Sequence, residues 1–152
     1  MFLSVKQYLK NEQATLEFGA HLANWLPQKG IVFLHGPLGA GKTTLVRGLL
    51  RAIGHRGNTK SPTYTLVEPY QVGERQFFHF DLYRLSDPEE LEYMGIRDYV
   101  EENSLCLIEW PEKASEFLPK ADMTLTLSYE GEQRSIKLDI HNPDWKKLAV
   151  FG

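Results

Sequence analysis

The sequence has almost no cysteine, no excess of positive charge and no long hydrophobic run. Cys106 is the only cysteine among the 152 residues, so no disulfide can form within the chain and no cysteine–histidine zinc site is predicted. No segment approaches the roughly 18 apolar residues of a membrane-spanning helix, and residues 1–6 lack the apolar core of a signal peptide. We therefore expect a cytoplasmic protein with no membrane partner.

The net charge of −3 gives no global support for direct binding to nucleic acid, because proteins that neutralise many phosphates are usually basic. A loose basic cluster is better interpreted as a solvated helix face, and it comprises Lys29, Arg47, Arg51, His55, Arg56 and Lys60. Cys106 lies in the apolar run 105–108, where it is predicted to be a small buried hydrophobic residue. The composition and length indicate one globular domain over residues 1–152.

The most informative segment is Gly-Pro-Leu-Gly-Ala-Gly-Lys-Thr at residues 36–43, which matches GxxxxGK[ST] at every fixed position. The apolar run 31–34 predicts a buried strand before it, and the spacing over 44–53 predicts a helix after it. Glycines let successive backbone N–H groups surround phosphate oxygens, and the helix N-terminus adds partial positive charge. We therefore predict that Lys42 reaches the β- and γ-phosphates of a nucleotide and that Thr43 is a Mg²⁺ ligand. The predicted nucleotide-binding residues of this loop are Gly36, Leu38, Gly39, Ala40, Gly41, Lys42, Thr43 and Thr44.

Two acidic residues end predicted strands, where α/β sheets place their ligands. Glu109 closes the apolar run 105–108 in a Walker-B-like pattern that has Glu in place of the usual Asp. After the glycine loop, the pattern favours a catalytic or Mg²⁺-binding acid over a surface carboxylate at a strand end, but it does not say which acid binds the metal and which positions the water. Asp81 closes the aromatic strand 77–80, and the pattern fits a catalytic acid as well as an exposed acid paired with Arg84. His79 should point to the same face as Asp81, where a structural histidine is favoured over a general base.

A hydroxyl-bearing segment, Ser61-Pro62-Thr63, follows Thr43 by about twenty residues, where many nucleotide-binding proteins have a loop that senses the γ-phosphate. A proline turn leading into a strand explains the same residues equally well. The sequence therefore leaves both interpretations open.

Alternating strand and helix signals predict an α/β fold, a three-layer sandwich like that of P-loop NTPases. Its mixed sheet is parallel at the centre and ends in a C-terminal antiparallel hairpin. Asn11 should cap a helix that runs to about residue 25 and has an apolar stripe of Leu16, Ala20, Ala23 and Leu26. Either Ser86 with Glu89 or Asp87 with Pro88 should start a later helix that ends near Gly95. The expected strands are 2–8, 31–34, 64–70, 76–81, 104–109, 122–130 and 132–140, with further helices at 97–101 and 144–151 and an irregular connection at 54–60.

Four motifs in this order resemble the TsaE (formerly YjeE) family, which comprises small bacterial P-loop ATPases needed for the threonylcarbamoyladenosine modification of tRNA. They are Gly-Pro-Leu-Gly-Ala-Gly-Lys-Thr, Ser-Pro-Thr-Tyr from residue 61, His-Phe-Asp-Leu-Tyr-Arg from residue 79, and Ile-Glu-Trp-Pro from residue 108. The resemblance covers residues 12 to 120 or so. Pro37 stands where the family often has Asp, and we expect this to cost little affinity.

The resemblance implies ATP and Mg²⁺ as cofactors and assigns roles to further residues. Ser61 and Thr63 would form a switch-like loop, Asp81 and Glu109 would be the acids essential for hydrolysis, and Trp110 would lie beside the site. The family also holds adenine partly with its N-terminal segment, which makes Glu12 and Thr15 candidate contacts.

The resemblance further implies an ATPase that is slow alone and acts on a heterodimer of TsaB and TsaD, with tRNA contacted only indirectly. A partner that orders the loops would complete the hydrolytic geometry. One alternative is a small-metabolite or nucleoside kinase, although the chain lacks an arginine-rich lid. Another alternative is an interaction module whose bound nucleotide is never hydrolysed. A GTPase is disfavoured because no Asn-Lys-x-Asp motif occurs.

Overall fold

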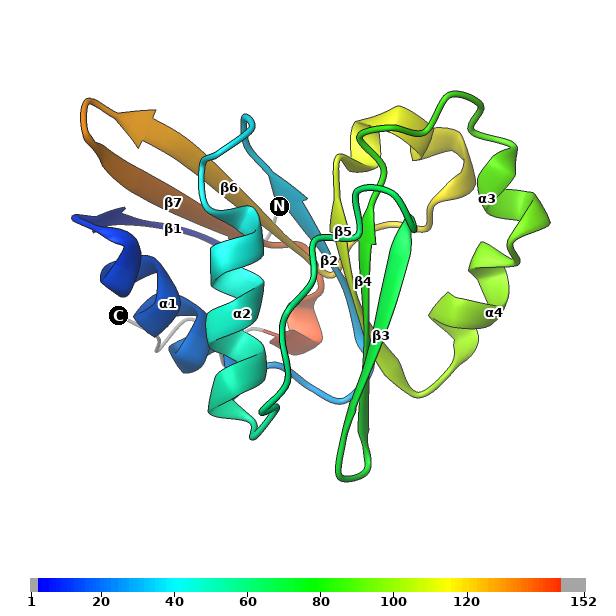
Figure 1. The fold of residues 1–152 in the computed structure, drawn as a ribbon, viewed down its shortest axis with the longest axis horizontal. Coiled ribbons are helices and arrows are strands. Elements are labelled where there is room, and N and C mark those ends of the chain that lie inside the picture. The colour runs from blue at the N-terminus through cyan, green and yellow to red at the C-terminus, as the bar shows by residue number, and fades with distance from the viewer. Residues whose placement is uncertain (1–2, 146–152) are drawn as a thin grey trace.

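Within residues 3–145, which the computed structural model describes, seven strands form one sheet with helices on both faces (Figure 1). The strand order is β1-β7-β6-β2-β5-β4-β3. The elements along the chain are β1 (Leu3–Leu9), α1 (Glu12–Ala23), β2 (Gly30–His35), α2 (Lys42–Ala52), β3 (Val67–Val72), β4 (Arg75–Asp81), α3 (Glu90–Tyr93), α4 (Ile96–Glu101), β5 (Ser104–Glu109), the 3₁₀ segment η1 (Pro111–Phe117), β6 (Met123–Glu130) and β7 (Gln133–Ile140).

The centre of the sheet is parallel and its edges are antiparallel. β5 pairs in parallel with β2 and β4, and β6 pairs in parallel with β2. β7 pairs antiparallel with both β6 and β1 at one edge, and β3 pairs antiparallel with β4 at the other. The predicted mixed α/β sheet with its C-terminal hairpin is confirmed.

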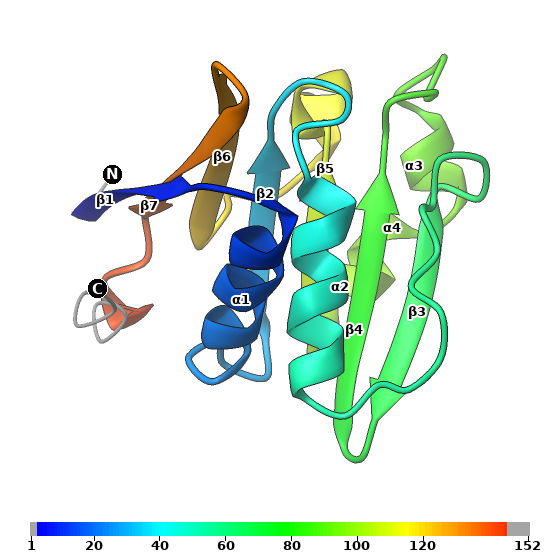
Figure 2. The same ribbon diagram turned by 60° about the vertical axis from the view of Figure 1, so that its left-hand side comes forward.

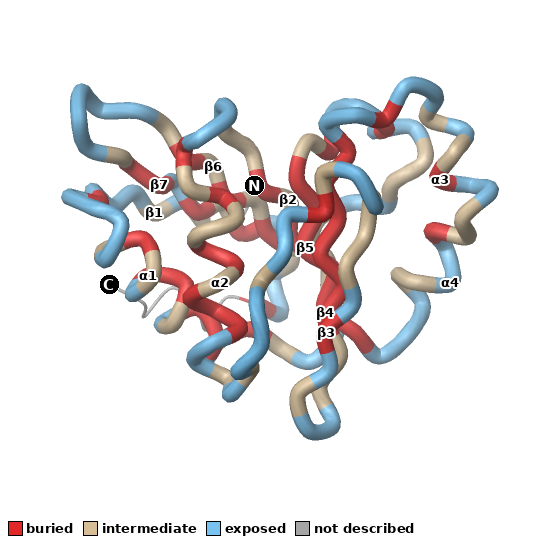
Figure 3. The backbone as a smooth tube through the Cα atoms, viewed as in Figure 1, coloured by how far each residue is buried: buried red, intermediate tan, exposed pale blue. Residues whose placement is uncertain are grey.

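The helices form two outer layers. α1 and α2 lie side by side on one face, and α3, α4 and η1 lie on the other (Figure 2). Since successive strand residues point to opposite faces, the central strands carry two separate cores, and burial is concentrated there (Figure 3). Leu105 and Leu107 pack under α1 and α2, whereas Cys106 and Ile108 pack on the opposite face. Cys106 is fully buried, as the sequence predicted.

The first helix begins as predicted but buries a different face. The side chain of Asn11 accepts a hydrogen bond from the Ala14 amide at 2.9 Å and caps α1. The predicted stripe is wrong in part, because Leu16 and Ala20 are only half-buried. The buried residues of α1 are Thr15, Phe18, Gly19, Leu22 and Ala23. Helix α1 packs against α2 as well as the sheet. Its buried face is therefore rotated from the face that the spacing of its apolar residues predicted.

Two helical glycines let α1 and α2 touch through their backbones. A Cβ atom on Gly19 would lie 2.2 Å from the Leu45 carbonyl oxygen, and one on Gly48 would lie 2.2 Å from the Leu16 carbonyl oxygen. Neither position has room for a side chain. The close crossing places α2, and with it the glycine loop of residues 36–41, next to α1.

Three sequence predictions need correction or fall outside the described residues. The strand expected from residue 64 begins at Val67, because Leu66 adopts a left-handed conformation (φ 68°) and ends a turn. The helix expected to end near Gly95 spans only Glu90–Tyr93, and both predicted starts are wrong, because its N-cap is Glu89, whose side chain makes no capping hydrogen bond. The Asp87 carboxylate accepts from the Glu89 amide at 3.0 Å in the turn before the helix. Residues 143–145 form a 3₁₀ turn, and the rest of the expected closing helix at 144–151 lies outside the described residues.

No helix among residues 3–145 has the length and apolar character needed to cross a bilayer.

Candidate nucleotide-binding site

The loop between β2 and α2 has the backbone of an anion-binding turn. Gly36, Gly39 and Gly41 have φ values of 148°, 78° and 108°, a region that residues with a side chain rarely adopt. A Cβ atom on Gly36 would also lie 2.8 Å from the carbonyl oxygen of Leu127 on β6. Glycine at position 36 is therefore required by both conformation and space.

The N-terminus of α2 offers its amides to a ligand. Its N-cap residue is Gly41, and within the described residues no side chain caps the helix. The first backbone N–H groups of a helix have no acceptor inside the helix, and the helix dipole favours an anion there. The Ala40 amide, by contrast, donates to the Pro37 carbonyl at 3.2 Å and so closes the turn. The glycine loop and the first turn of α2, which contains Lys42, Thr43 and Thr44, thus fit a phosphate group.

Lys42 is almost fully buried, with 5% of its side chain exposed. Its Nζ donates to the Gly36 carbonyl at 2.5 Å and lies 4.0 Å from Glu109 Oε1. Trp110 has a left-handed conformation (φ 57°), and its ring centroid lies 4.0 Å from the Lys42 ammonium. Burial lowers the pKa of Lys42, while the carboxylates of Glu109, Asp81 and Glu112 oppose this shift. The cation is therefore held by a carbonyl, a ring and a carboxylate at a site that water hardly reaches.

The two predicted acids lie beside each other at the ends of adjacent parallel strands. Asp81 of β4 is the register partner of Glu109 of β5, and both are buried. Glu109 Oε2 accepts from Thr43 Oγ1 at 3.4 Å and lies 2.6 Å from His79 Nε2. Asp81 is not an exposed partner of Arg84, whose guanidinium instead stacks 4.6 Å from the Tyr64 ring centroid. The geometry brings both acids to the phosphate-binding loop.

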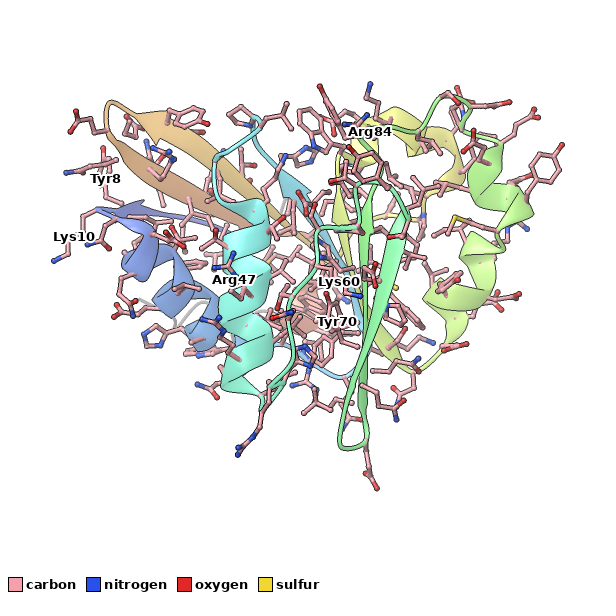
Figure 4. All side chains as sticks on the ribbon, in the orientation of Figure 1. Tyr8, Lys10, Arg47, Lys60, Tyr70 and Arg84 are labelled. Atoms are coloured by element: carbon pink, nitrogen blue, oxygen red, sulfur yellow. The ribbon has the colours of Figure 1, made fainter. Side chains whose placement is uncertain are left out.

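The hydroxyl-bearing segment also reaches these acids. Thr63 Oγ1 donates to Asp81 Oδ2 at 3.2 Å, and Ser61 Oγ lies 2.7 Å from Thr63 Oγ1. The Tyr70 hydroxyl anchors the segment at its start, since it accepts from the Lys60 amide at 3.0 Å and donates to the Lys60 carbonyl at 3.4 Å (Figure 4). Residues 62–66 form a turn that leads into β3, and the Leu66 amide donates to the Pro62 carbonyl at 2.8 Å. The segment is thus a proline turn whose hydroxyls reach Asp81, and γ-phosphate sensing stays a prediction.

Two cavities flank the phosphate-binding loop. One of about 270 Å³ contains the chemistry-bearing groups, and its lining includes Lys42, Thr43, Ser61, Thr63, Asp81, Glu109 and Trp110. The other, of about 260 Å³, is lined partly by Glu12 and Thr15, the two residues predicted to contact adenine. Gly39, Gly41 and Thr44 line both cavities. A nucleotide could therefore lie across the loop with its phosphates in one cavity and its base in the other.

Sequence reasoning missed the wall of the second cavity that comes from the C-terminal hairpin. Glu132, Gln133 and Arg134 line that wall. The Arg134 guanidinium stacks 4.2 Å from the ring centroid of Tyr129, whose hydroxyl donates to the Leu38 carbonyl at 2.6 Å. No motif marks these residues, and only the pairing of β6 with β2 brings them to the loop.

The donor set fits a magnesium ion that is bound mainly through nucleotide. No group of three or more histidine, cysteine, aspartate or glutamate residues within 3–145 could hold a metal by itself. P-loop sites bind Mg²⁺ with one hydroxyl, one carboxylate, phosphate oxygens and water. Thr43 and Glu109, whose side-chain oxygens are 3.4 Å apart, are the hydroxyl and the carboxylate that would hold the ion.

Comparison with known proteins identifies relatives of this chain. A family model described as "Threonylcarbamoyl adenosine biosynthesis protein TsaE" matches residues 9–136. Relatives named "tRNA threonylcarbamoyladenosine biosynthesis protein TsaE" include one from Haemophilus influenzae, 54% identical over 140 residues that cover 89% of each chain. Another, from Synechocystis, is 41% identical over 114 residues that cover 72% of each chain.

A solved structure has the same fold. The crystal structure of Bacillus subtilis YdiB matches with a TM-score of 0.84 and 24% identity, over 99% of this chain and 95% of that one. The family model spans most of the chain, and the relative from Haemophilus influenzae is more than half identical. The chain belongs to the TsaE family, whose members take part in the biosynthesis of threonylcarbamoyladenosine in tRNA.

Proposed function

We propose that this protein binds ATP with Mg²⁺ and hydrolyses it slowly on its own. It would support the threonylcarbamoyladenosine modification of tRNA by acting on a TsaB–TsaD transferase complex, with tRNA reached only through that complex. The observation that carries the ATPase proposal is the convergence of Lys42, Thr43, Asp81 and Glu109 on one cavity of about 270 Å³ at the phosphate-binding loop. The membership in the TsaE family supports the role in tRNA modification.

Each group has a role in this proposal. The amides at the start of α2 and the Lys42 ammonium bind the phosphates, and Thr43 and Glu109 hold Mg²⁺, which would neutralise charge on the β- and γ-phosphate oxygens. Asp81 orients the attacking water. Thr63, which donates a hydrogen bond to Asp81, couples the position of its loop to the presence of the γ-phosphate. The base lies in the second cavity, where Glu12, Thr15 and Arg134 are its candidate contacts.

Two contacts support the proposal that turnover is slow without a partner. Lys42 donates to the Gly36 carbonyl, and Asp81 accepts from Thr63. Each interaction occupies a group that catalysis needs, so the lysine must turn to the phosphates and the carboxylate must turn to a water molecule. A partner that repositions the segment around Thr63 would release Asp81, which is the way nucleotide switches couple loop order to hydrolysis.

The test measures ATP hydrolysis by the purified protein, alone and with a TsaB–TsaD pair from the same organism. We expect marked stimulation by the pair, and its loss in Glu109→Ala. Lys42→Ala should lose tight ATP binding, and unchanged affinity in this variant would contradict the site assignment. Asp81→Asn should keep ATP binding and lose turnover, whereas in a protein that only binds ATP it would change little. If the pair neither stimulates hydrolysis nor forms a complex, the proposed role is wrong, and small-molecule phosphate acceptors should be tested for kinase activity.

A further inference from the structure

His79 is a fully buried polar residue that touches the metal-site carboxylate. It lies in β4 with no exposed surface, and its Nε2 atom is 2.6 Å from Glu109 Oε2. It is absent from the lining of the cavity that contains Lys42, Asp81 and Glu109. A group without access to that cavity cannot exchange a proton with substrate or water there, so His79 can act only through Glu109.

The strand register explains how the contact arises. Glu109 is the direct neighbour of Asp81 across the sheet, whereas His79 is the neighbour of Leu107. His79 therefore lies diagonally behind Glu109 on the same face of the sheet. The glutamate side chain must bend back along the sheet to reach it, and an aspartate is one methylene group shorter. This gives a physical reason for glutamate at the end of β5, where the Walker-B pattern usually has aspartate.

The contact divides the two oxygens of Glu109 between different partners. Oε2 contacts His79 and Thr43, and Oε1 lies 4.0 Å from the Lys42 ammonium. A buried lysine attracts a nearby carboxylate strongly, because little water screens the two charges. Without a donor behind it, the Glu109 carboxylate would be free to turn towards Lys42 and away from Thr43.

The other ring nitrogen sets His79 apart from an ordinary structural histidine. Its Nδ1 atom is buried and has no hydrogen-bond partner among the described residues. An unpaired buried polar atom lowers stability, so an apolar residue of similar size should be tolerated by the fold. Nε2 is thus the one nitrogen with a described partner, and that partner is Glu109.

We propose that His79 is a positioning residue, which donates a hydrogen bond to Glu109 and thereby holds its carboxylate beside Thr43 for Mg²⁺. The inference rests on the proposed function. Residues that orient the ligands of a metal affect metal affinity or activity by about 10- to 100-fold when they are changed. His79 should therefore matter for the dependence on Mg²⁺ and for kcat, and much less for nucleotide affinity or for stability.

Three variants separate positioning from a structural role. His79→Leu removes the donor and keeps an apolar side chain. His79→Gln restores an amide N–H donor near the position of Nε2. Phe77→Leu is the matched control, because Phe77 lies on the same strand and the same face, is equally buried and belongs to the hydrophobic core. Each variant is assayed for kcat and KM with the TsaB–TsaD pair, for the Mg²⁺ concentration that half-saturates binding of a fluorescent ATP analogue, and for Tm.

For His79→Leu we expect kcat to fall by about 10- to 100-fold and the Mg²⁺ requirement to rise by a similar factor. Affinity measured at saturating Mg²⁺ and Tm should stay close to those of the unmodified chain, and His79→Gln should recover most of the loss. Phe77→Leu should show the reverse, with a lower Tm and nearly unchanged kcat. The proposal is overturned if His79→Leu keeps the normal Mg²⁺ requirement, or if it loses as much Tm as Phe77→Leu and glutamine rescues nothing. Absence of hydrolysis in the unmodified protein would refute the proposed function alone, because the Mg²⁺ dependence of binding would still test His79.

Discussion

Replacing Gly48 with alanine should destabilise the fold, even though alanine is the better helix former. The new Cβ atom would lie 2.2 Å from the Leu16 carbonyl oxygen and 2.9 Å from the carbonyl carbon and Cα of the same residue. These are backbone atoms, so no side-chain rotation relieves the clash. Helices α1 and α2 would have to separate by about 1 Å in a core that packs as densely as a crystal.

Two opposing contributions set the size of the effect. Helix propensity favours alanine by about 1 kcal/mol. Overpacking a well-packed core costs about 1–3 kcal/mol, and contact with a rigid backbone favours the upper end of that range. We expect a net loss of about 1–2 kcal/mol in the free energy of unfolding, which corresponds to a fall in Tm of about 2–8 °C for a chain of this size.

Thermal unfolding followed by circular dichroism measures the change. Ala52→Gly is the control, because Ala52 is exposed at the end of the same helix and reports propensity without packing. Gly19→Ala probes the reciprocal contact and should act in the same direction, since its Cβ atom would lie 2.2 Å from the Leu45 carbonyl oxygen. An unchanged or higher Tm for Gly48→Ala would refute the reasoning, because propensity would then outweigh the helix–helix contact.

Two further predictions concern ionisation. Burial raises the pKa of the Cys106 thiol to about 11, and only the thiolate is nucleophilic. Iodoacetamide at about pH 8 should therefore label the folded chain at least about 100-fold more slowly than the chain unfolded in urea. Rapid labelling of the folded chain, read by mass spectrometry, would contradict the burial. Burial also lowers the pKa of Lys42, so part of the lysine is neutral at alkaline pH, and ATP phosphates should raise that pKa again. Binding should therefore take up protons, and increasingly so as the pH rises towards 10.5, the ordinary lysine pKa. Calorimetry in buffers of different ionisation enthalpy measures this uptake, and proton release over that range would contradict the proposed contact with phosphate.

Local sequence patterns were enough to predict the glycine loop at residues 36–43 and the two acids Asp81 and Glu109. The glycines of the loop specify positive φ angles, and the strand before it and the helix after it are encoded by adjacent residues. Asp81 and Glu109 follow from period-two strands that end in an acid. Sequence reasoning could not foresee that Thr63 donates a hydrogen bond to Asp81, because that bond joins residues that are 18 positions apart.

Long-range packing explains the predictions that failed. The spacing of apolar residues in α1 predicted that Leu16 and Ala20 would be buried. Because α1 crosses α2 closely, Thr15 and Phe18 are buried instead. The strand expected from residue 64 starts late because Leu66 takes a left-handed conformation. The Leu66 amide donates to the Pro62 carbonyl at 2.8 Å, and the Leu66 carbonyl accepts from the distant Asp81 amide at 3.0 Å.

By itself, the sequence determined the α/β class, the loop at residues 36–43 and the acids at the ends of β4 and β5. Backbone conformation and strand or helix period depend mainly on residues that are neighbours in the chain, so these features can be inferred without a structure. The tertiary structure alone decided that Arg134 lines the second cavity and that His79 contacts Glu109. Both follow from strand order and register, which are set by packing over the whole sheet and are not encoded in any one segment.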